Sequence, residues 1–160
     1  MRILVTGGAG FIGSHLVEYF QGKAEICVLD SLRTGYLKNL DGFDVEFIEG
    51  DICDRAAVKA AMQGVDYVFH LAAMVSVPES MFKPGECVDI NVHGLLNVLE
   101  EAAAAGVKKL CFSTSAAIYG DNPVVPKLET MIPEPTSPYA IQIALIGHKS
   151  RSSPNFRSSK

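Results

Sequence analysis

The chain has 160 residues and a formal net charge of −4, a length that fits one domain with a sizeable core. With 48% hydrophobic and 20% charged residues, the composition excludes a fibrous or intrinsically disordered protein. No stretch approaches the roughly 18–20 apolar residues of a membrane span, and the N-terminus lacks the features of a secretory signal. We therefore expect a cytoplasmic protein with no membrane partner.

The cysteines and the charge distribution bear on disulfides, metal sites and nucleic-acid partners. Four cysteines are scattered without a CxxC pair, which favours reduced thiols and predicts neither disulfides nor a metal site. All 18 acidic side chains lie in residues 1–134, whereas residues 135–160 carry four bases and no acid. This basic tail lacks a sustained cluster and interleaved aromatic residues, so we expect no nucleic-acid partner.

In chain order, short apolar runs alternate with segments of helical period. Strands are expected at residues 2–6, 25–30, 45–49, 66–73 and 108–113, and helices at 11–21, 54–63 and from about 84 or 86 to 105. Near-continuous apolar strands between helices predict an α/β fold with a parallel sheet covered on both faces. Residues 121–138 hold five prolines and are expected to form a loop, after which Tyr139 should open another helix.

A glycine loop stands between the first strand and the first helix. Gly8-x-Gly10-x-x-Gly13 has the dinucleotide-binding spacing, in which glycines permit a tight turn and close approach of the backbone to a pyrophosphate. Asp30 ends the second strand about 20 residues later, where its carboxylate can accept hydrogen bonds from ribose hydroxyls and repel a 2′-phosphate. The pattern favours NAD over NADP, although Arg33 lies nearby. The alternative is a glycine-rich turn with no ligand.

Together with further segments, the loop resembles the extended short-chain dehydrogenases/reductases of the NAD-dependent epimerase/dehydratase family. The resemblance rests on Thr6-Gly7-x-x-Gly10-x-x-Gly13 and, in order, on "GDICD" (50–54), "HLAA" (70–73), "NVHG" (91–94), "FSTSAAIYG" (112–120) and "SPY" (137–139). It implies a Rossmann-type doubly wound parallel sheet, truncated after about five strands, over an incomplete NAD-binding domain of residues 1–141.

The resemblance also implies site residues. The residues expected to contact NAD are Gly7, Gly10, Phe11, Ile12, Gly13, Asp30, Asp51, Ile52, Leu71, Ala72, Ala73, Asn91, Ser113 and Tyr139. Tyr139 would act as the general base during hydride transfer at sugar C4. Ser115 would orient the sugar oxygen, with Thr114 as its rival.

Simpler roles remain open for several of these polar residues. His70 lies on an apolar strand and is expected to be structural, while His15 and His93 fit helix surfaces or packing positions. Asp51 could cap the helix that begins near Arg55. The polar run from Ser113 to Ser115 could be no more than the end of a strand.

The pair Ser115-Ala116 lacks the acids that sugar-nucleotide dehydratases and decarboxylases carry there, so a 4-epimerase is favoured over those alternatives. "HLAAMVSVPESM" resembles the UDP-glucose and UDP-N-acetylglucosamine 4-epimerases, which implies a UDP-hexose substrate. The resemblance further suggests a homodimer formed through helices at 86–105 and 139–148.

The family's tyrosine is followed at i+4 by a lysine, but position 143 is Ile143. Such a cation shares the helix face and stabilises the phenolate, and Lys149 lies about 15 Å of helical rise away from Tyr139. We therefore expect impaired catalysis, and the resemblance, which covers only the N-terminal half of the family's length, implies that the substrate domain is lacking as well. Residues 142–160 are interpreted as a divergent basic Ser-rich tail, out of frame or disordered. The alternatives are a non-catalytic NAD-binding or interaction protein and a non-functional truncated product.

Overall fold

The computed structural model of the protein describes residues 1–128 and 130–152, and within 146–152 it describes the backbone only. The chain forms two compact units. The first contains residues 1–73 and 93–113, and the second contains residues 74–92 and the described part of the chain from 114 onward. The end of the expected tail, residues 153–160, lies outside the described residues, and the expected boundary at 141/142 stays a prediction.

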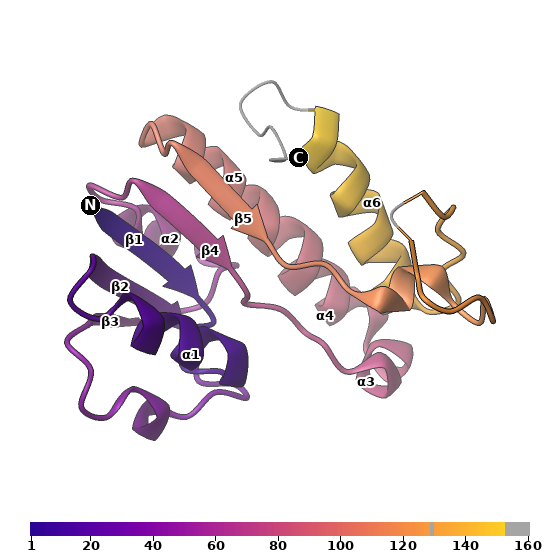
Figure 1. Cartoon of the computed structure of the whole chain (residues 1–160), viewed down its shortest axis with the longest axis horizontal. Helices are drawn as coiled ribbons and strands as arrows, with labels where there is room; N and C mark the ends of the chain where they lie inside the picture. Colours follow the sequence, from indigo (N-terminus) through magenta and orange to yellow (C-terminus); the bar gives the residue numbers. More distant parts are fainter. Residues whose placement is uncertain (129, 153–160) are drawn as a thin grey trace. The chain divides into compact units, whose positions relative to one another are not determined.

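The first unit is built on a parallel sheet of five strands (Figure 1). Its strands are β1 (Arg2–Thr6), β2 (Glu25–Asp30), β3 (Glu46–Glu49), β4 (Tyr67–His70) and β5 (Lys109–Phe112). They are arranged in the order β3-β2-β1-β4-β5, and every neighbouring pair is parallel. The chain builds outward from β1 in both directions, so the expected Rossmann-type doubly wound fold is confirmed. The switch in direction falls between β1 and β4, where such sheets open a crevice at their carboxyl ends.

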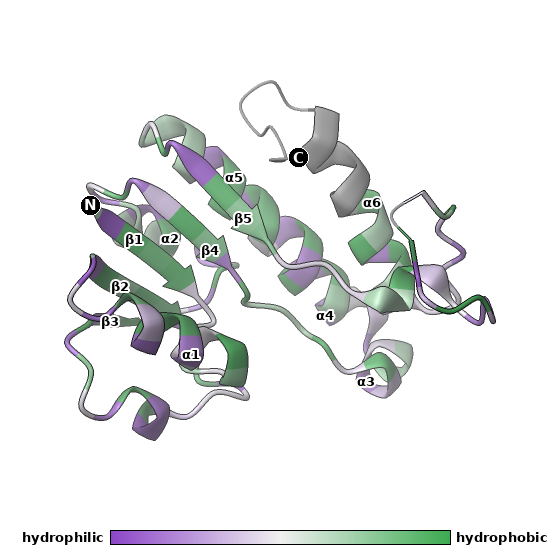
Figure 2. Cartoon of the chain, in the orientation of Figure 1, coloured by the Kyte–Doolittle hydropathy of each residue, from purple (hydrophilic) through white to green (hydrophobic). Residues whose placement is uncertain are grey.

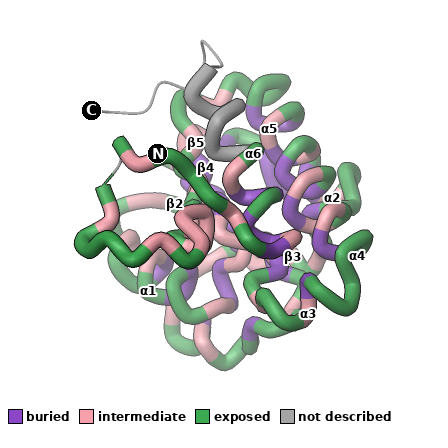
Figure 3. The backbone as a smooth tube through the Cα atoms, turned by 90° about the vertical axis from the view of Figure 1, so that its right-hand side faces the viewer, coloured by how far each residue is buried: buried purple, intermediate pink, exposed green. Residues whose placement is uncertain are grey.

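Helices α1 (Phe11–Phe20), α2 (Arg55–Ala61) and α5 (Leu95–Ala104) cover the sheet, with α1 on one face and the other two on the opposite face (Figure 1). β1 and β2 are hydrophobic along most of their length (Figure 2), as a strand covered on both sides requires. On the α1 face, Val17 packs against Ile3 and Val28 in a buried cluster. Buried and exposed positions alternate along α5 (Figure 3).

The other face is fixed partly by charge. Arg55, at the start of α2, pairs with Glu101 on α5 at 2.7 Å between Nε and Oε1 and with Glu100 at 2.8 Å between Nη1 and Oε2. Glu101 is buried, and burying an unpaired carboxylate is costly. The N-cap of α2 is Asp54, whose side chain accepts the Ala56 N–H. The alternative that Asp51 caps this helix is therefore wrong, because the Asp51 side chain accepts the Cys53 N–H instead.

The second unit contains α3 (Val77–Phe82), α4 (Pro84–Val88), the short 3₁₀ helix η3 (Ala116–Tyr119) and α6 (Pro138–Ser152). Helix α6 packs against α3, α4 and η3. Helix α3 was not expected, although Ser76 accepts the Glu79 N–H as its N-cap, and Ser-x-x-Glu is a capping signal. Helix α6 begins where expected and continues through residue 152, into the residues that were interpreted as a divergent tail.

The helix expected from about 84 to 105 is not uniform. A π-helical segment, η2 (Asp89–Gly94), separates α4 from α5. Within it, the Asn91 side chain is bound to the main chain of Met74, and Gly94 lies so close to Ile52 that a β-carbon would come within 2.7 Å of the Ile52 side chain. Hydrophobic periodicity does not report such contacts, which explains why the pattern predicted one regular helix.

The described residues contain neither a membrane-spanning helix nor a metal-binding cluster. None of the helices in this part of the chain is long and apolar enough to cross a membrane. No group of three or more His, Cys, Asp or Glu side chains among the same residues is placed to hold a metal ion.

The sheet's central strand supplies a direct test of the packing. Leu4 is fully buried on β1, whereas Leu96 on α5 is 46% exposed. We expect Leu4→Ala to lower the free energy of unfolding by about 2–5 kcal/mol, because it removes buried contacts and leaves a cavity. Leu96→Ala is the matched control and should cost far less. Chemical denaturation of both variants measures the difference, and equal losses would contradict the described core.

Candidate functional site

The glycine loop joins the carboxyl end of β1 to α1 in a tight turn. Gly7 has φ +73°, which favours glycine, and its N–H donates to the Leu29 carbonyl at 2.9 Å. The Gly10 N–H closes the turn by donating to the Gly7 carbonyl at 3.1 Å. The shape of the loop therefore depends on the backbone conformation that glycine allows at position 7. No ligand is needed to set it.

The space around each glycine differs in a way that matters for a ligand. A β-carbon on Gly7 would lie 2.7 Å from the Ala72 nitrogen, and one on Gly13 would lie 2.3 Å from the Gly7 carbonyl oxygen. These glycines allow close packing of backbone on backbone. A β-carbon on Gly10 would meet only the Gly7 oxygen, at 3.2 Å. Gly10 therefore borders open space, as a position approached by a ligand should.

The start of α1 faces the same loop. No side chain caps this helix at Gly10, so the first N–H groups of the helix keep their hydrogen-bonding capacity and the positive end of the helix dipole is uncovered. Phe11 and Ile12 are exposed at 79% and 59%. A helix start of this kind, following a glycine turn, suits the phosphates of a nucleotide.

Asp30 lies beside the loop at the end of β2 and is buried. Its Oδ2 accepts the Ala9 N–H at 2.9 Å, and its Oδ1 accepts the Leu32 N–H at 2.8 Å. Each carboxylate oxygen can accept a further hydrogen bond. Leu32 has φ +56°, an uncommon conformation for a residue other than glycine. The carboxylate therefore stabilises the conformation of the loop, a role that the spacing of the motif did not predict.

Thr6 connects the loop to the exit of β4. Its hydroxyl oxygen accepts the Leu71 and Ala72 N–H groups at 3.2 and 3.3 Å and lies 2.7 Å from Nδ1 of His70. The Thr6 hydroxyl and the His70 ring are therefore hydrogen-bonded to each other. Thr6 appeared in the sequence motif but not among the expected site residues.

His70 has the structural role that was expected. It is buried, its ring stacks on that of Phe112 with centroids 5.8 Å apart, and desolvation lowers its pKa to about 4. A neutral ring held by Thr6 supports the junction between β1 and β4.

The first unit brings most of the expected cofactor residues to the carboxyl ends of its strands. Asp51 follows β3 and is exposed, whereas Ile52 is 4% exposed and packs against Gly94. The Asn97 side chain donates to the Ile52 carbonyl at 3.0 Å. The residues that follow β4 and β5 and complete this edge are Leu71, Ala72, Ala73 and Ser113. The contacts of all these residues with a cofactor stay predictions.

In the second unit, Ser137 Oγ accepts the Ala140 N–H at 3.2 Å, so it caps α6 and places Tyr139 in the first turn. Ser115 Oγ accepts the Ala117 N–H at the start of η3, and η3 packs against α6. Thr114 is exposed. The expected catalytic residues therefore lie on neighbouring elements of one unit.

The position of the expected lysine is apolar and enclosed. Ile143 is 3% exposed, and Tyr139, one turn earlier, is 8% exposed. Beside Ile143, the buried Gln142 accepts a hydrogen bond from the Cys87 thiol at 3.0 Å. Asn91, expected to contact the cofactor, binds the Met74 N–H and carbonyl at 2.8 and 3.0 Å. The side chain of Lys149 lies outside the described residues.

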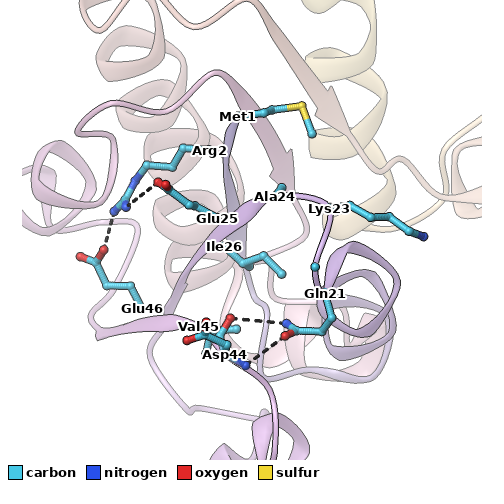
Figure 4. Close-up of a pocket in the computed structure, with 11 residues that line it drawn as sticks. Met1, Arg2, Gln21, Lys23, Ala24, Glu25, Ile26, Asp44, Val45 and Glu46 are labelled. Carbon is cyan, nitrogen blue, oxygen red and sulfur yellow. Dashed lines mark hydrogen bonds and ion pairs between the residues drawn. The ribbon is translucent and has the colours of Figure 1, made fainter.

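A separate pocket lies at the amino ends of β1, β2 and β3 (Figure 4). In this pocket Arg2 pairs with Glu46, and its Nη1 lies 4.0 Å from Oε2 of Glu25. Gln21 Oε1 accepts a hydrogen bond from the Asp44 N–H at 3.0 Å. Ligands of open α/β sheets bind at the opposite, carboxyl ends of the strands, and the Arg2 guanidinium here already pairs with Glu46, although its Nε is buried without a hydrogen-bond partner among the described residues. The glycine-loop edge is the stronger candidate.

Comparison with known proteins gives a family match for most of the chain. The model of the NAD dependent epimerase/dehydratase family matches residues 3–148. UDP-glucose 4-epimerase of Neisseria meningitidis serogroup C is 40% identical over 155 residues, which cover 91% of this chain and 46% of the relative.

Solved structures give the same picture. The Thermus thermophilus UDP-glucose 4-epimerase complex with NAD is 43% identical with a TM-score of 0.86, covering 93% of this chain and 49% of that one. The UDP-N-acetylglucosamine 4-epimerase from Methanobrevibacter ruminantium is 35% identical with a TM-score of 0.87, covering 95% and 51%. The chain spans about half the length of these relatives.

The buried His70 makes stability depend on pH. Its pKa of about 4 lies below the value near 6.5 of an unfolded chain, so the unfolded state takes up the proton first as pH falls. The stability contribution is complete above pH 6.5 and is lost as pH falls to 4, by on the order of 3 kcal/mol.

Denaturation at pH 7 and pH 4 tests the predicted loss of folding stability. His70→Asn, which keeps an acceptor for Thr6, should lose less stability between the two pH values than the unmodified chain. His15→Asn, at an exposed position, should behave like the unmodified chain. The same loss in all three proteins would contradict a buried neutral His70.

Proposed function

The chain belongs to the NAD dependent epimerase/dehydratase family, and we propose that its glycine-loop edge binds NAD in a UDP-hexose 4-epimerase. The observation that carries the proposal is the open side of Gly10 beside the uncapped start of α1. The loop leaves room where a diphosphate needs it and supplies N–H groups there. The named relatives are UDP-glucose and UDP-N-acetylglucosamine 4-epimerases, which supports the substrate class.

The residues at this edge fit the parts of NAD. The N–H groups of Phe11, Ile12 and Gly13 would bind the pyrophosphate, and Asp30 would accept the adenosine ribose hydroxyls through its remaining lone pairs. A buried carboxylate repels a 2′-phosphate, which favours NAD over NADP. Contacts to adenine are assigned to Asp51 and Ile52. The remaining contacts to the cofactor are assigned to Gly7, Gly10, Leu71, Ala72, Ala73, Asn91, Ser113 and Tyr139.

Bound NAD supplies a hydride acceptor and donor for the sugar C4 carbon. Tyr139 takes the C4 hydroxyl proton as general base, and the hydroxyl of Ser115, or of its rival Thr114, donates to the sugar oxygen. Ser115 Oγ already accepts the Ala117 N–H, so its own proton remains for donation. This assignment rests on the position of Tyr139 in the first turn of α6 and on the packing of α6 against η3.

Ile143 limits this chemistry. A buried isoleucine one turn from Tyr139 provides no charge to stabilise a phenolate, which a lysine would do. We propose that catalysis by this chain is impaired for this reason. The same observation favours a second candidate function, a non-catalytic NAD-binding protein.

A homodimer through helices at 86–105 and 139–148 is part of the same proposal. The support is that α5 exposes Leu96 and that α6 exposes Ile141 and Leu145, which are apolar groups that an interface would cover.

Gly10→Val tests the NAD site. The added side chain fills the space that the pyrophosphate needs, so we expect the dissociation constant for NAD, measured by calorimetry, to rise at least ten-fold, about 1.4 kcal/mol. Gly85→Val on α4 is the matched control, because a β-carbon there has no atom within 4 Å and the backbone is not in the left-handed region. If Gly10→Val binds NAD as tightly as the control variant does, the site assignment fails.

Ile143→Lys tests the impairment. We expect it to raise interconversion of UDP-glucose and UDP-galactose by roughly 10²–10⁴, the usual contribution of general base catalysis. Ile143→Met keeps an apolar side chain of similar size and should give no gain, and Tyr139→Phe added to Ile143→Lys should abolish the gain. Equal turnover by the Lys and Met variants would show that the missing cation is not the limiting defect.

A further inference from the structure

We propose that Asn39 is a positioning residue for the glycine loop: its side-chain amide holds the Ala9–Gly10 peptide in the orientation that a bound diphosphate requires. Asn39 belongs to the short 3₁₀ helix η1 (Leu37–Leu40), which follows β2 and was not expected from the sequence. The inference rests on the proposed NAD site and adds to it a residue outside the glycine motif.

The backbone of Ala9 is hydrogen-bonded at every available position. Its carbonyl oxygen accepts the Asn39 side-chain amide at 2.8 Å and the Tyr36 N–H at 3.1 Å. Its N–H donates to Asp30 Oδ2 at 2.9 Å. A carbonyl oxygen has two lone pairs, so both are occupied. Ala9 is also fully buried, so in the folded chain its backbone groups are bound to these protein partners.

These bonds fix two consecutive peptide planes. The Ala9 carbonyl and the Gly10 N–H belong to one peptide, and the Gly10 N–H donates to the Gly7 carbonyl at 3.1 Å. This peptide is therefore held at both ends, by Asn39 and Tyr36 on one side and by Gly7 on the other. Asp30 holds the preceding peptide through the Ala9 N–H.

The direction of the Ala9 carbonyl matters for electrostatic reasons. With its oxygen bound to Asn39, the carbonyl dipole is directed at donors of the protein, and the uncapped start of α1 is left to interact with an anion. A rotated Ala9–Gly10 peptide would bring a carbonyl oxygen, which carries negative partial charge, to the side where the phosphates are proposed to lie. Gly10 has no side chain to resist that rotation, so the restraint must come from its hydrogen-bond partners.

The segment that carries Asn39 is itself anchored. A β-carbon on Gly35 would lie 2.9 Å from the Ala9 carbonyl carbon, so the two backbones are in contact. Leu40, next to Asn39, is buried in the same cluster as Ala9 and Val17. Tyr36 and Leu37, which lie between Gly35 and Asn39 in the chain, are exposed. Asn39 itself is half-buried, and these contacts of its neighbours restrain the segment that carries its amide.

The test compares three variants by calorimetric NAD binding and by amide hydrogen exchange of Gly10 in the ligand-free protein. Asn39→Asp replaces the donor by an acceptor that faces the Ala9 oxygen, and Asn39→Ala removes the donor. Gln21→Ala is the control, because Gln21 also binds the main chain by its amide, at Asp44 in the amino-end pocket (Figure 4).

We expect Asn39→Asp to weaken NAD binding roughly ten-fold, the scale of one lost hydrogen bond, and to speed Gly10 exchange. Asn39→Ala should weaken NAD binding and speed Gly10 exchange to a smaller extent. It replaces the Asp variant in the test if that variant does not fold. Gln21→Ala should leave both quantities unchanged even where its unfolding temperature falls.

Unchanged Gly10 exchange in the Asn39 variants would overturn the proposal, and so would an equal loss of NAD affinity in Gln21→Ala. If the unmodified chain binds no NAD, the proposed function fails by itself. Gly10 exchange in the variants then still decides whether Asn39 holds the loop.

Discussion

The close contact of backbone on backbone between Gly7 and the exit of β4 is the constraint on which the candidate site depends. No β-carbon fits at Gly7 beside the Ala72 nitrogen, and the Thr6 hydroxyl binds two N–H groups of the same β4 exit. The neutral, buried His70 completes this junction. Because β1 and β4 are joined here, the glycine loop is directed along the carboxyl edge of the sheet and α1 starts beside the open side of Gly10.

Much of this could be predicted from local pattern. The strands were found because buried parallel strands are continuous apolar runs, and the glycine loop because its spacing encodes a turn that few other sequences adopt. Asp30 was found by its distance from the loop. What the spacing could not report is that the Asp30 carboxylate also binds the Ala9 and Leu32 N–H groups, since those contacts depend on how the chain returns after β2.

The side-chain contacts that sequence reasoning missed share a physical cause. Asn39 acts on Ala9 across 30 positions of the chain, and Asn91 acts on Met74 from within a π-helical segment. Hydrogen bonds between a side chain and a distant main chain leave no periodic signal in the sequence. The N-cap of α3 was different, because Ser76 and Glu79 form a recognisable capping pattern that could have indicated this helix.

The second unit bears on the interpretation of the last described residues. Gln142 and Ile143 are buried, and Gln142 is hydrogen-bonded to Cys87, so helix α6 packs against α4 with residues that were interpreted as part of a divergent tail. The family match likewise extends to residue 148. An apolar residue at 143 is therefore compatible with the packing of this unit, while it removes the charge that a tyrosine base needs.

A titration of the ¹⁵N-labelled chain with NAD, followed by the chemical shifts of its backbone amides, tests the central claim most directly. The account predicts that the largest shift changes fall on Gly10, Phe11, Ile12 and Gly13, where the diphosphate would be bound. Shift changes concentrated on residues of the amino-end pocket, such as Glu25 and Glu46, or no change at saturating NAD, would contradict it.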